Sequence, residues 1–273
     1  HYASAYARWV RLMAGANFGS VVLDYDGTCI ETEGRWGLPP DEFQTALVRL
    51  LEAGVGVGFA SGRGGSLHED LRKWVPEDLH KLVLLGLYNG SWVQPLAAEP
   101  KPPKRAHAAI SAVAERLKFL EQAGLAKWQP RKTQISVSAS GMSTSVRVLR
   151  DLVETSIPPA LRGRVKVLSS AHSVDVLPVE FGKTTVLSAV ESVYGPAVVI
   201  GDQGAFGGND HELLHATQRS FTVGVSSPDP PRCWAPGPTA WKGPSATTRI
   251  LKAMDVRQGR FRLSPRRLWR PRG

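Results

Sequence analysis

The sequence predicts an α/β protein, in which a parallel sheet flanked by helices is interrupted by a smaller inserted α+β domain. Short apolar runs alternate with segments of helical periodicity at both ends of the chain. This alternation is typical of parallel strands joined by right-handed crossovers. Between residues 99 and 177 the order changes to helix, strand, helix and two strands, which indicates an insertion of a different fold class.

The first part of the expected sheet domain contains three helices and three strands. Apolar residues recur at helical spacing in each helix, and each strand is a short continuous apolar run, as in strands buried on both faces. In chain order we expect a helix over 2–14, a strand over 20–23, a helix over 41–53, a strand over 55–60, a helix over 67–74 and a strand over 82–87.

The insertion begins at a proline-rich segment, 99–104, and the sheet pattern resumes near residue 178. We expect, in order, a helix over 106–124, a strand over 134–139, a helix over 144–157, strands over 165–168 and 173–177, a helix over 183–193, strands over 197–200 and 221–225 and a helix over 246–254. The predicted domains are therefore a core over 1–98 and 178–256 and an inserted domain over 99–177.

The charge of the chain is concentrated at its C-terminal end. The formal net charge is +10, and residues 257–273 hold seven arginines and no acid. We expect this segment to be a flexible basic tail that makes weak contacts with nucleic acid or another polyanion. Two cysteines cannot form a disulfide framework, and no bilayer-spanning apolar run or signal-peptide pattern is present. The expected location is cytoplasmic, with no membrane partner.

Polar residues gather where predicted strands end. Asp24 and Asp26 follow the first strand, and Gly27 allows a sharp turn that brings both toward one centre. Ser61-Gly62-Arg63 follows the second strand, and Asp202 ends a later one. Because the carboxyl ends of parallel strands share one edge of the sheet, ligands bind there.

Each of these residues also has a structural interpretation. Asp-Gly is a common solvated turn, and Ser61 could cap the following helix. Lys183 could be a solvated lysine in the first turn of a helix, and Asn209-Asp210 could be an N-cap. Arg63 could face either solvent or a phosphate.

The order of these segments resembles a known family. The segments are Asp24-x-Asp26-Gly27-Thr28, Ser61-Gly62-Arg63, Lys183, and Gly201-Asp202 followed by Asn209-Asp210. Together they are similar to the four motifs of the haloacid dehalogenase superfamily of aspartate-nucleophile phosphohydrolases. The resemblance covers roughly residues 18–225 and implies a Rossmann-like core.

The place of the insertion, after Tyr88-Asn89-Gly90 and before Lys183, resembles the large α+β cap (type C2B) of Cof-type sugar phosphatases and phosphomannomutases. Six residues separate Asp202 from Asn209, whereas most Cof-type members have two. The longer form is more similar to phosphomannomutase.

The resemblance implies the catalytic and metal-binding roles. Asp24 would be the nucleophile that forms an aspartyl-phosphate, and Asp26 would serve as general acid and then general base. Mg²⁺ would be held by Asp24, the backbone carbonyl of Asp26 and Asp202, with support from Asp210.

The resemblance also implies a phosphate site. Ser61 would donate a hydrogen bond to the phosphate, and Lys183 would neutralise it while fixing the nucleophile. The remaining expected phosphate contacts are Thr28, Gly62 and Asn209. We expect contacts to the rest of the substrate from Arg63, Asn89, Trp128, Arg131, Lys132 and Gln134.

We therefore expect the protein to be a Mg²⁺-dependent phosphatase that hydrolyses a small phosphorylated metabolite, with sugar phosphates as candidates. The string from Gly207 to Glu212 favours the alternative of a phosphosugar mutase. A second alternative is a degenerate enzyme whose basic tail binds nucleic acid. Hinges over 99–104 and 178–182 would let the inserted domain open and close over the substrate.

Overall fold

The computed structural model describes residues 1–273 except 102, 140–143, 233, 238–240 and 269–273. Its contacts divide the chain into two compact units. The core unit comprises His1–Pro100, Lys183–Phe206 and Asp210–Gly273, and the inserted unit comprises Lys101–Gly182 and Gly207–Asn209. Among the described residues, no helix combines the length and the apolar character needed to cross a membrane.

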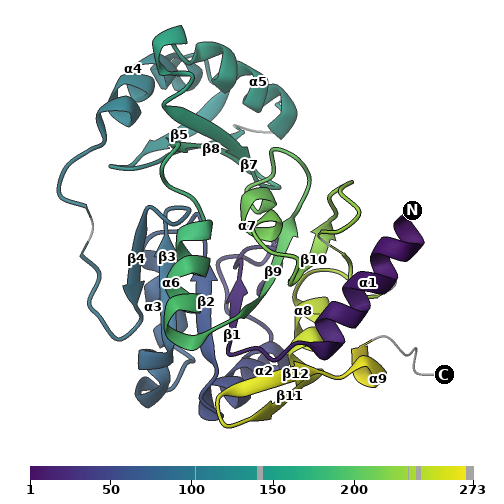
Figure 1. Ribbon diagram of the computed structural model, residues 1–273. Helices are drawn as coiled ribbons and strands as arrows, with labels where there is room; N and C mark the ends of the chain where they lie inside the picture. The colour runs from purple at the N-terminus through teal and green to yellow at the C-terminus, as the bar shows by residue number, and fades with distance from the viewer. Residues whose placement is uncertain (102, 140–143, 233, 238–240, 269–273) are drawn as a thin grey trace. The chain divides into compact units, whose positions relative to one another are not determined.

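The core unit is built on a six-stranded sheet of order β10-β9-β1-β2-β3-β4 (Figure 1). Its strands are β1 (Ser20–Leu23), β2 (Gly56–Ala60), β3 (Val83–Leu87), β4 (Trp92–Pro95), β9 (Ala197–Gln203) and β10 (Ser220–Val225). The first five strands of that order are parallel, and β4 is antiparallel to β3. The α/β class is therefore confirmed, and β4 is a strand that we did not expect.

Helices cover both faces of this sheet (Figure 1). They are α1 (Tyr2–Gly15), α2 (Asp41–Glu52), α3 (Gly65–Arg72), the 3-10 helix η1 (Glu77–Leu82), α6 (Thr184–Tyr194), α7 (His211–His215) and α8 (Gly243–Lys252). Successive side chains of a strand point to opposite faces. Val22 of β1 accordingly belongs to the core cluster on the α6 face, whereas Val21 and Leu23 belong to the larger cluster on the other face.

Glycines in the central strands allow α6 to lie close to the sheet. A Cβ atom on Gly58 of β2 would come 2.7 Å from Cγ2 of Val190, and one on Gly86 of β3 would overlap Cγ2 of Val186. Both valines are buried in α6. This close packing fixes the position of Lys183, which is the N-cap residue of α6.

The C-terminal segment differs from the expected flexible tail. A hairpin of β11 (Met254–Arg257) and β12 (Arg260–Leu263) leads to α9 (Pro265–Leu268). Phe261 is buried, its ring stacks on that of Phe18 at 5.2 Å, and the two backbones exchange hydrogen bonds of 2.8 and 2.9 Å. The expectation is therefore wrong for residues 257–268, because alternate apolar residues anchor them. Residues 269–273 lie outside the described part of the chain.

The inserted unit is an α+β unit with a four-stranded antiparallel sheet of order β5-β6-β8-β7. Its elements are α4 (Ala108–Gln122), β5 (Ala126–Pro130), β6 (Ile135–Ala139), α5 (Val146–Ser156), the 3-10 helix η2 (Pro159–Leu161), β7 (Val165–Ser169) and β8 (Ser173–Pro178). Strand β5 was not expected. Residues 207–209 join this unit because the backbone N–H of Asn209 donates to the carbonyl of Ser169 at 2.9 Å.

Candidate active site

The site in the core unit begins at the carboxyl end of β1. The backbone N–H of Asp24 donates to the carbonyl of Ile200 in β9 at 2.9 Å, so the residue is still held by the sheet. The chain then turns at Gly27, which has a φ of 81°. A Cβ atom there would lie 2.5 Å from Oδ2 of Asp202, so both the turn and the close approach of Asp202 require glycine.

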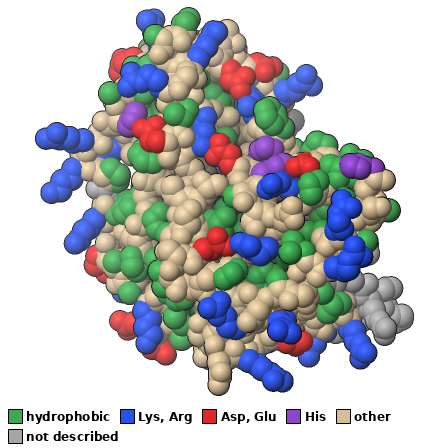
Figure 2. Space-filling view, in the orientation of Figure 1, with side chains coloured by type: hydrophobic (Ala, Val, Ile, Leu, Met, Phe, Trp, Pro, Cys, Tyr) green, Lys and Arg blue, Asp and Glu red, His purple; other side chains and the backbone are tan. Residues whose placement is uncertain are grey.

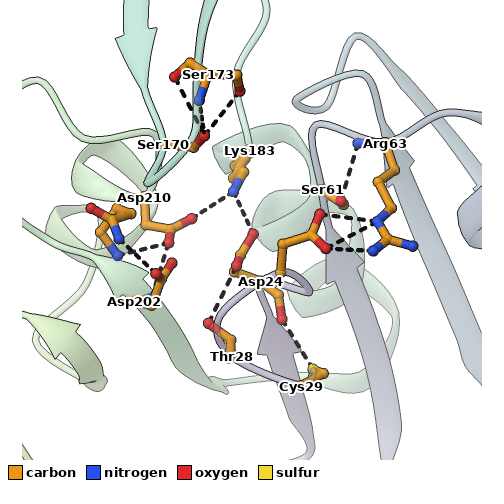
Figure 3. Close-up of polar contacts among 12 residues, drawn as sticks. Asp24, Thr28, Cys29, Ser61, Arg63, Ser170, Ser173, Lys183, Asp202 and Asp210 are labelled. Atoms are coloured by element: carbon orange, nitrogen blue, oxygen red, sulfur yellow. Dashed lines mark hydrogen bonds and ion pairs between the residues drawn. The ribbon is translucent and has the colours of Figure 1, made fainter. Parts of the chain in front are cut away.

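Three acidic side chains and one lysine meet at this edge (Figure 3). Carboxylate oxygens of Asp24, Asp202 and Asp210 all lie within 4.8 Å of one another. Nζ of Lys183 donates to Oδ1 of Asp24 and to Oδ1 of Asp210, both at 2.6 Å. The most exposed of these four residues, Asp202, retains only 8% of its accessible surface. The solvated alternatives for Asp24 and Lys183 are therefore wrong.

The ionisation of the cluster follows from its charge balance. Burial, followed by the charge of Asp210, raises the pKa of Asp24 to about 7. Burial, followed by the charges of Asp210 and Asp24, raises the pKa of Asp202 to about 9. Burial alone would lower the pKa of Lys183, but the two carboxylates outweigh it and raise that pKa. One ammonium group thus faces three carboxyl groups. When all three are ionised, the cluster carries more negative than positive charge.

These residues fit a divalent cation. The ligand atoms available are carboxylate oxygens, which are the type that Mg²⁺ prefers. A cation among Asp24, Asp202 and Asp210 would supply the missing positive charge, and it would return the raised carboxyl pKa values toward their usual range. The described residues contain no other group of three or more acidic, histidine or cysteine side chains with this spacing.

Asp210 connects Lys183 to the end of β9 through its two carboxylate oxygens. Its Oδ2 accepts hydrogen bonds from the backbone N–H groups of Asp202 and Gln203, at 3.0 and 3.1 Å. It occupies the N-cap position of α7, but its side chain makes no capping hydrogen bond. The N-cap interpretation is therefore wrong for its carboxylate, which orients Lys183 and the end of β9.

Two residues of the turn after β1 restrain Asp24. Oγ1 of Thr28 donates to Oδ2 of Asp24 at 3.2 Å, so both oxygens of this carboxylate are held. Sγ of Cys29 donates to the backbone carbonyl of Asp24 at 3.1 Å, and burial raises the pKa of this thiol well above its usual value. Thr28, which was expected to contact phosphate, is thus a neighbour of the carboxylate itself.

Ser61 lies at the carboxyl end of β2, next to β1 in the sheet. It is buried, and its Oγ accepts a hydrogen bond from the backbone N–H of Arg63 at 3.1 Å. Helix α3 starts only at Gly65, with Gly64 as its N-cap and no side-chain cap. Ser61 therefore does not cap that helix. Gly62 lies in the same turn.

Arg63 does not face solvent, and its side chain already has carboxylate partners. Its side chain is 9% exposed and forms ion pairs with Asp26 at 2.5 Å and Asp70 at 3.1 Å. Sequence reasoning missed this contact because 37 residues separate Arg63 from Asp26. Arg63 is thus a partner of the Asp26 side chain, and no local sequence motif indicates this pairing.

The turn after β3 has an unusual backbone. Tyr88, Asn89 and Gly90 all have positive φ values, of 51°, 54° and 80°. The backbone N–H of Asn89 donates to the carbonyl of Ser61 at 2.8 Å, and that of Tyr88 donates to the carbonyl of Arg63 at 2.8 Å. Such conformations are uncommon outside glycine and cluster at functional sites. The strained turn thus supports the Ser61–Arg63 segment, and Asn89 is fully buried beside it.

Of the residues of the inserted unit that were expected to contact substrate, Trp128 and Gln134 pack within the unit, whereas Arg131 and Lys132 are exposed. Trp128 pairs in register with Val137, packs against the hydrophobic cluster under α4 and α5, and donates from Nε1 to Glu121 at 2.8 Å. It therefore lies on the helix-covered face of the sheet, and a substrate contact from its ring is not supported. Gln134 is buried and donates to Oγ of Ser136 at 2.7 Å.

Arg131 and Lys132 lie in the turn between β5 and β6. Nζ of Lys132 donates to the carbonyl of Lys104 at 2.7 Å, and Nη2 of Arg131 donates to Oε1 of Gln129 at 3.3 Å. Both side chains are exposed. Asn209 also belongs to the inserted unit, so its expected phosphate contact stays a prediction.

Comparisons of the fold identify similar solved structures. One is a haloacid dehalogenase subclass IIB sugar phosphatase, with a TM-score of 0.57 and 16% identity over 77% of this chain and 89% of that chain. Another is a haloacid dehalogenase-like hydrolase from Bacteroides thetaiotaomicron, with a TM-score of 0.54 and 15% identity over 76% and 90%. A third is the IMP nucleotidase of Plasmodium falciparum, with a TM-score of 0.55 and 13% identity over 81% and 67%.

No protein-family model matches the sequence, and no curated protein matches it. At sequence identities of 13–16%, the similarity between this chain and those structures is a similarity of fold. The chain thus has the haloacid dehalogenase fold, a Rossmann-like core with an inserted α+β unit, as the four ordered motifs predict.

Proposed function

We propose that the protein is a Mg²⁺-dependent phosphatase that hydrolyses a small phosphorylated metabolite through an aspartyl-phosphate. The observation that carries this proposal is the buried cluster of Asp24, Asp202 and Asp210 around the single ammonium group of Lys183. Three carboxylates are costly to bury together unless a cation compensates them. Their position at the carboxyl ends of β1 and β9 is where ligands bind in open α/β sheets.

The chemistry can be assigned to the chain's own residues. An oxygen of Asp24 attacks phosphorus, forming a P–O bond while the bond to the leaving oxygen breaks and Asp26 gives that oxygen a proton. Asp26 then takes a proton from water, whose oxygen attacks phosphorus and releases Asp24 and inorganic phosphate. Thr28 and Lys183 hold the two oxygens of Asp24. Mg²⁺ held by Asp24, Asp202 and the backbone carbonyl of Asp26, with support from Asp210, would neutralise charge on the phosphate.

The similar structures include a sugar phosphatase and a nucleotidase, so the likeness of fold does not choose between sugar phosphates and nucleotides. We propose a sugar phosphate or a comparably small metabolite as the substrate, and we expect the inserted unit to exclude polymers from the site.

The test measures Mg²⁺-dependent release of inorganic phosphate from p-nitrophenyl phosphate and from a panel of sugar phosphates and nucleotides. Asp24→Asn should abolish turnover while circular dichroism and the melting temperature show that the fold persists. Asp78→Asn, at an exposed position of the same unit, is the matched control and should be fully active. Undiminished turnover in Asp24→Asn would refute the nucleophile, and unchanged turnover in EDTA would refute the metal requirement.

A phosphosugar mutase would return the phosphoryl group to sugar rather than to water. Incubation with mannose 1-phosphate or glucose 1-phosphate and a sugar bisphosphate activator separates the two reactions. We expect free phosphate as the product, and conversion of 1-phosphate to 6-phosphate without release of phosphate would favour the mutase.

A further inference from the structure

The guanidinium group of Arg63 holds both oxygens of Asp26. Nε donates to Oδ2 at 2.9 Å and to Oδ1 at 3.1 Å, and Nη2 donates to Oδ1 at 2.5 Å. A two-point contact between the planar guanidinium and a carboxylate fixes direction as well as distance. Rotation of the Asp26 side chain is therefore restricted while this contact lasts.

Arg63 is itself fixed by helix α3, by segment 31–37 and by Tyr25, the chain neighbour of Asp26. Nη1 donates to Oδ2 of Asp70 in α3 at 3.1 Å, and Nη2 also donates to the backbone carbonyl of Arg35. Its Cζ atom lies 4.9 Å from the centre of the Tyr25 ring and 5.7 Å from that of Trp36. Cations over aromatic faces at such distances are attracted to them. The guanidinium thus has little freedom, and its hydrogen-bond donors are largely used.

We infer that Arg63 is a positioning residue for Asp26: it fixes the orientation of the carboxylate that the proposed mechanism uses for proton transfer to the leaving group. This inference rests on the proposed function, because it assigns Arg63 to the proton-transfer step of the same site. Arg63 acts through Asp26 and not on the phosphate, since its donors go to carboxylates and a carbonyl. Segment 31–37, through the carbonyl of Arg35 and the ring of Trp36, is part of this support.

The inference makes a prediction about leaving groups. A phosphate ester with a basic leaving oxygen needs a proton as the bond to phosphorus breaks, whereas a stabilised leaving group such as p-nitrophenolate departs without one. The ratio kcat/KM includes the steps through departure of the leaving group. A residue that positions only the acid therefore affects kcat/KM for the first type of ester much more than for the second.

The experiment compares phenyl phosphate with p-nitrophenyl phosphate, two esters of nearly the same shape. Arg63→Ala should lower kcat/KM for phenyl phosphate at least about 10-fold more than for p-nitrophenyl phosphate, within the range that general acids contribute. Arg63→Lys should recover part of the loss, because it keeps a cation beside Asp26. Equal losses on both esters in folded Arg63→Ala protein would overturn the inference and assign Arg63 to phosphate binding or to the fold.

A second measurement keeps the inference testable if Arg63→Ala is unstable. In an Asp26→Ala background, Arg63→Lys should change kcat/KM for phenyl phosphate less than about 2-fold, because residues that act as a unit are not additive. A full additional loss there would also overturn the inference. Arg72→Ala removes an ion pair with Glu99 from the same helix as Asp70 and should leave both esters unaffected.

Failure of this inference differs from failure of the proposed function. If Asp24→Asn hydrolyses both esters normally, the proposed phosphatase mechanism is wrong whatever Arg63 does. If Asp24→Asn is inactive and the leaving-group effect is missing, only the role of Arg63 is wrong.

Discussion

Nζ of Lys183 lies 2.6 Å from Oδ1 of Asp24, and this ion pair joins the start of α6 to the end of β1. Both side chains are almost fully buried, at 1% and 4% exposure. The same nitrogen contacts Asp210, so one lysine connects three segments that are distant in the sequence. The carboxylates of Asp24 and Asp210 therefore keep their arrangement only while α6 stays against the sheet.

Replacement of Lys183 by methionine should destabilise the protein and stop turnover. Removing one partner of a buried ion pair leaves the other charge uncompensated, which costs about 3–5 kcal/mol. Urea unfolding measures the loss, and added Mg²⁺ should restore part of it by supplying positive charge to the carboxylates. Lys252→Met, which breaks an exposed pair with Glu42, is the control and should leave stability nearly unchanged. A Lys183→Met protein as stable as the parent would contradict the buried pair.

The raised carboxyl pKa values predict how stability depends on pH in the absence of metal. The folded protein binds protons on Asp24 and Asp202 more tightly than the unfolded chain, in which the pKa of an aspartate is 3.8. This stabilisation is fully present below about pH 4. It is lost as the pH rises through about 7 for Asp24 and about 9 for Asp202.

Melting temperatures in EDTA should accordingly fall as the pH rises over this range, and the stabilisation by Mg²⁺ should increase, because the metal binds the deprotonated carboxylates. Asp202→Asn should flatten the dependence at the alkaline end. A melting temperature in EDTA that rises between about pH 5 and pH 8 would contradict the raised pKa values.

Gly86→Ala should affect the site from a distance. The new methyl group would overlap Val186, so α6 must move away from β3, and Lys183 moves with it. Overpacking of this kind costs about 1–3 kcal/mol. We expect a lower melting temperature together with a lower kcat. Gly65→Ala, which meets no atom within 4 Å, is the matched control. Unchanged kcat in Gly86→Ala would show that α6 can shift without moving Lys183.

The fold and the acidic cluster could be predicted because their signals are local. Buried strands are continuous apolar runs, and Asp24, Ser61 and Asp202 each follow or end such a run. The parallel order of the strands then brings these residues to one edge. The Asn89-Gly90 dipeptide before Trp92 is also a local signal for the hairpin of β3 and β4, since both residues have a positive φ.

The remaining features depend on tertiary contacts. The alternation of Arg260, Phe261, Arg262 and Leu263 indicates a half-buried strand, but the run of arginines suggested a flexible tail instead. The pairing of Arg63 with Asp26 arises only because β1 and β2 are neighbours in the sheet. No spacing in the sequence specifies it, since either a phosphate or a carboxylate satisfies an arginine.

Contact with a polyanion stays a prediction. The residues expected to make it now lie on the hairpin of β11 and β12. The side chains of Arg257, Arg260 and Arg262 are exposed on β11 and β12. Basic side chains are prominent at the lower edge of Figure 2, where this hairpin lies in Figure 1. Affinity for single-stranded RNA should fall steeply with salt, and Arg257→Ala/Arg262→Ala should reduce both affinity and salt dependence. Arg116→Ala/Arg147→Ala, at exposed positions of the inserted unit, is the control. Binding that survives the first pair unchanged would exclude this surface.

Two exposed cations of the inserted unit are expected to help select the substrate. Arg131 and Lys132 are exposed cations, so their replacement removes charge without opening the hydrophobic core of that unit. Arg131→Ala/Lys132→Ala should raise KM for the metabolite that the panel identifies by about 10-fold, with kcat nearly unchanged, as expected for a loss of uniform binding. Turnover of p-nitrophenyl phosphate, which lacks the rest of that metabolite, should change little. Lys118→Ala, at an exposed position of α4, is the matched control. Trp128→Phe, on the helix-covered face, should lower the melting temperature without changing KM. If KM for both substrates rises equally in the Arg131/Lys132 variant, these residues act on the phosphate or on the fold, and the inserted unit selects its substrate elsewhere.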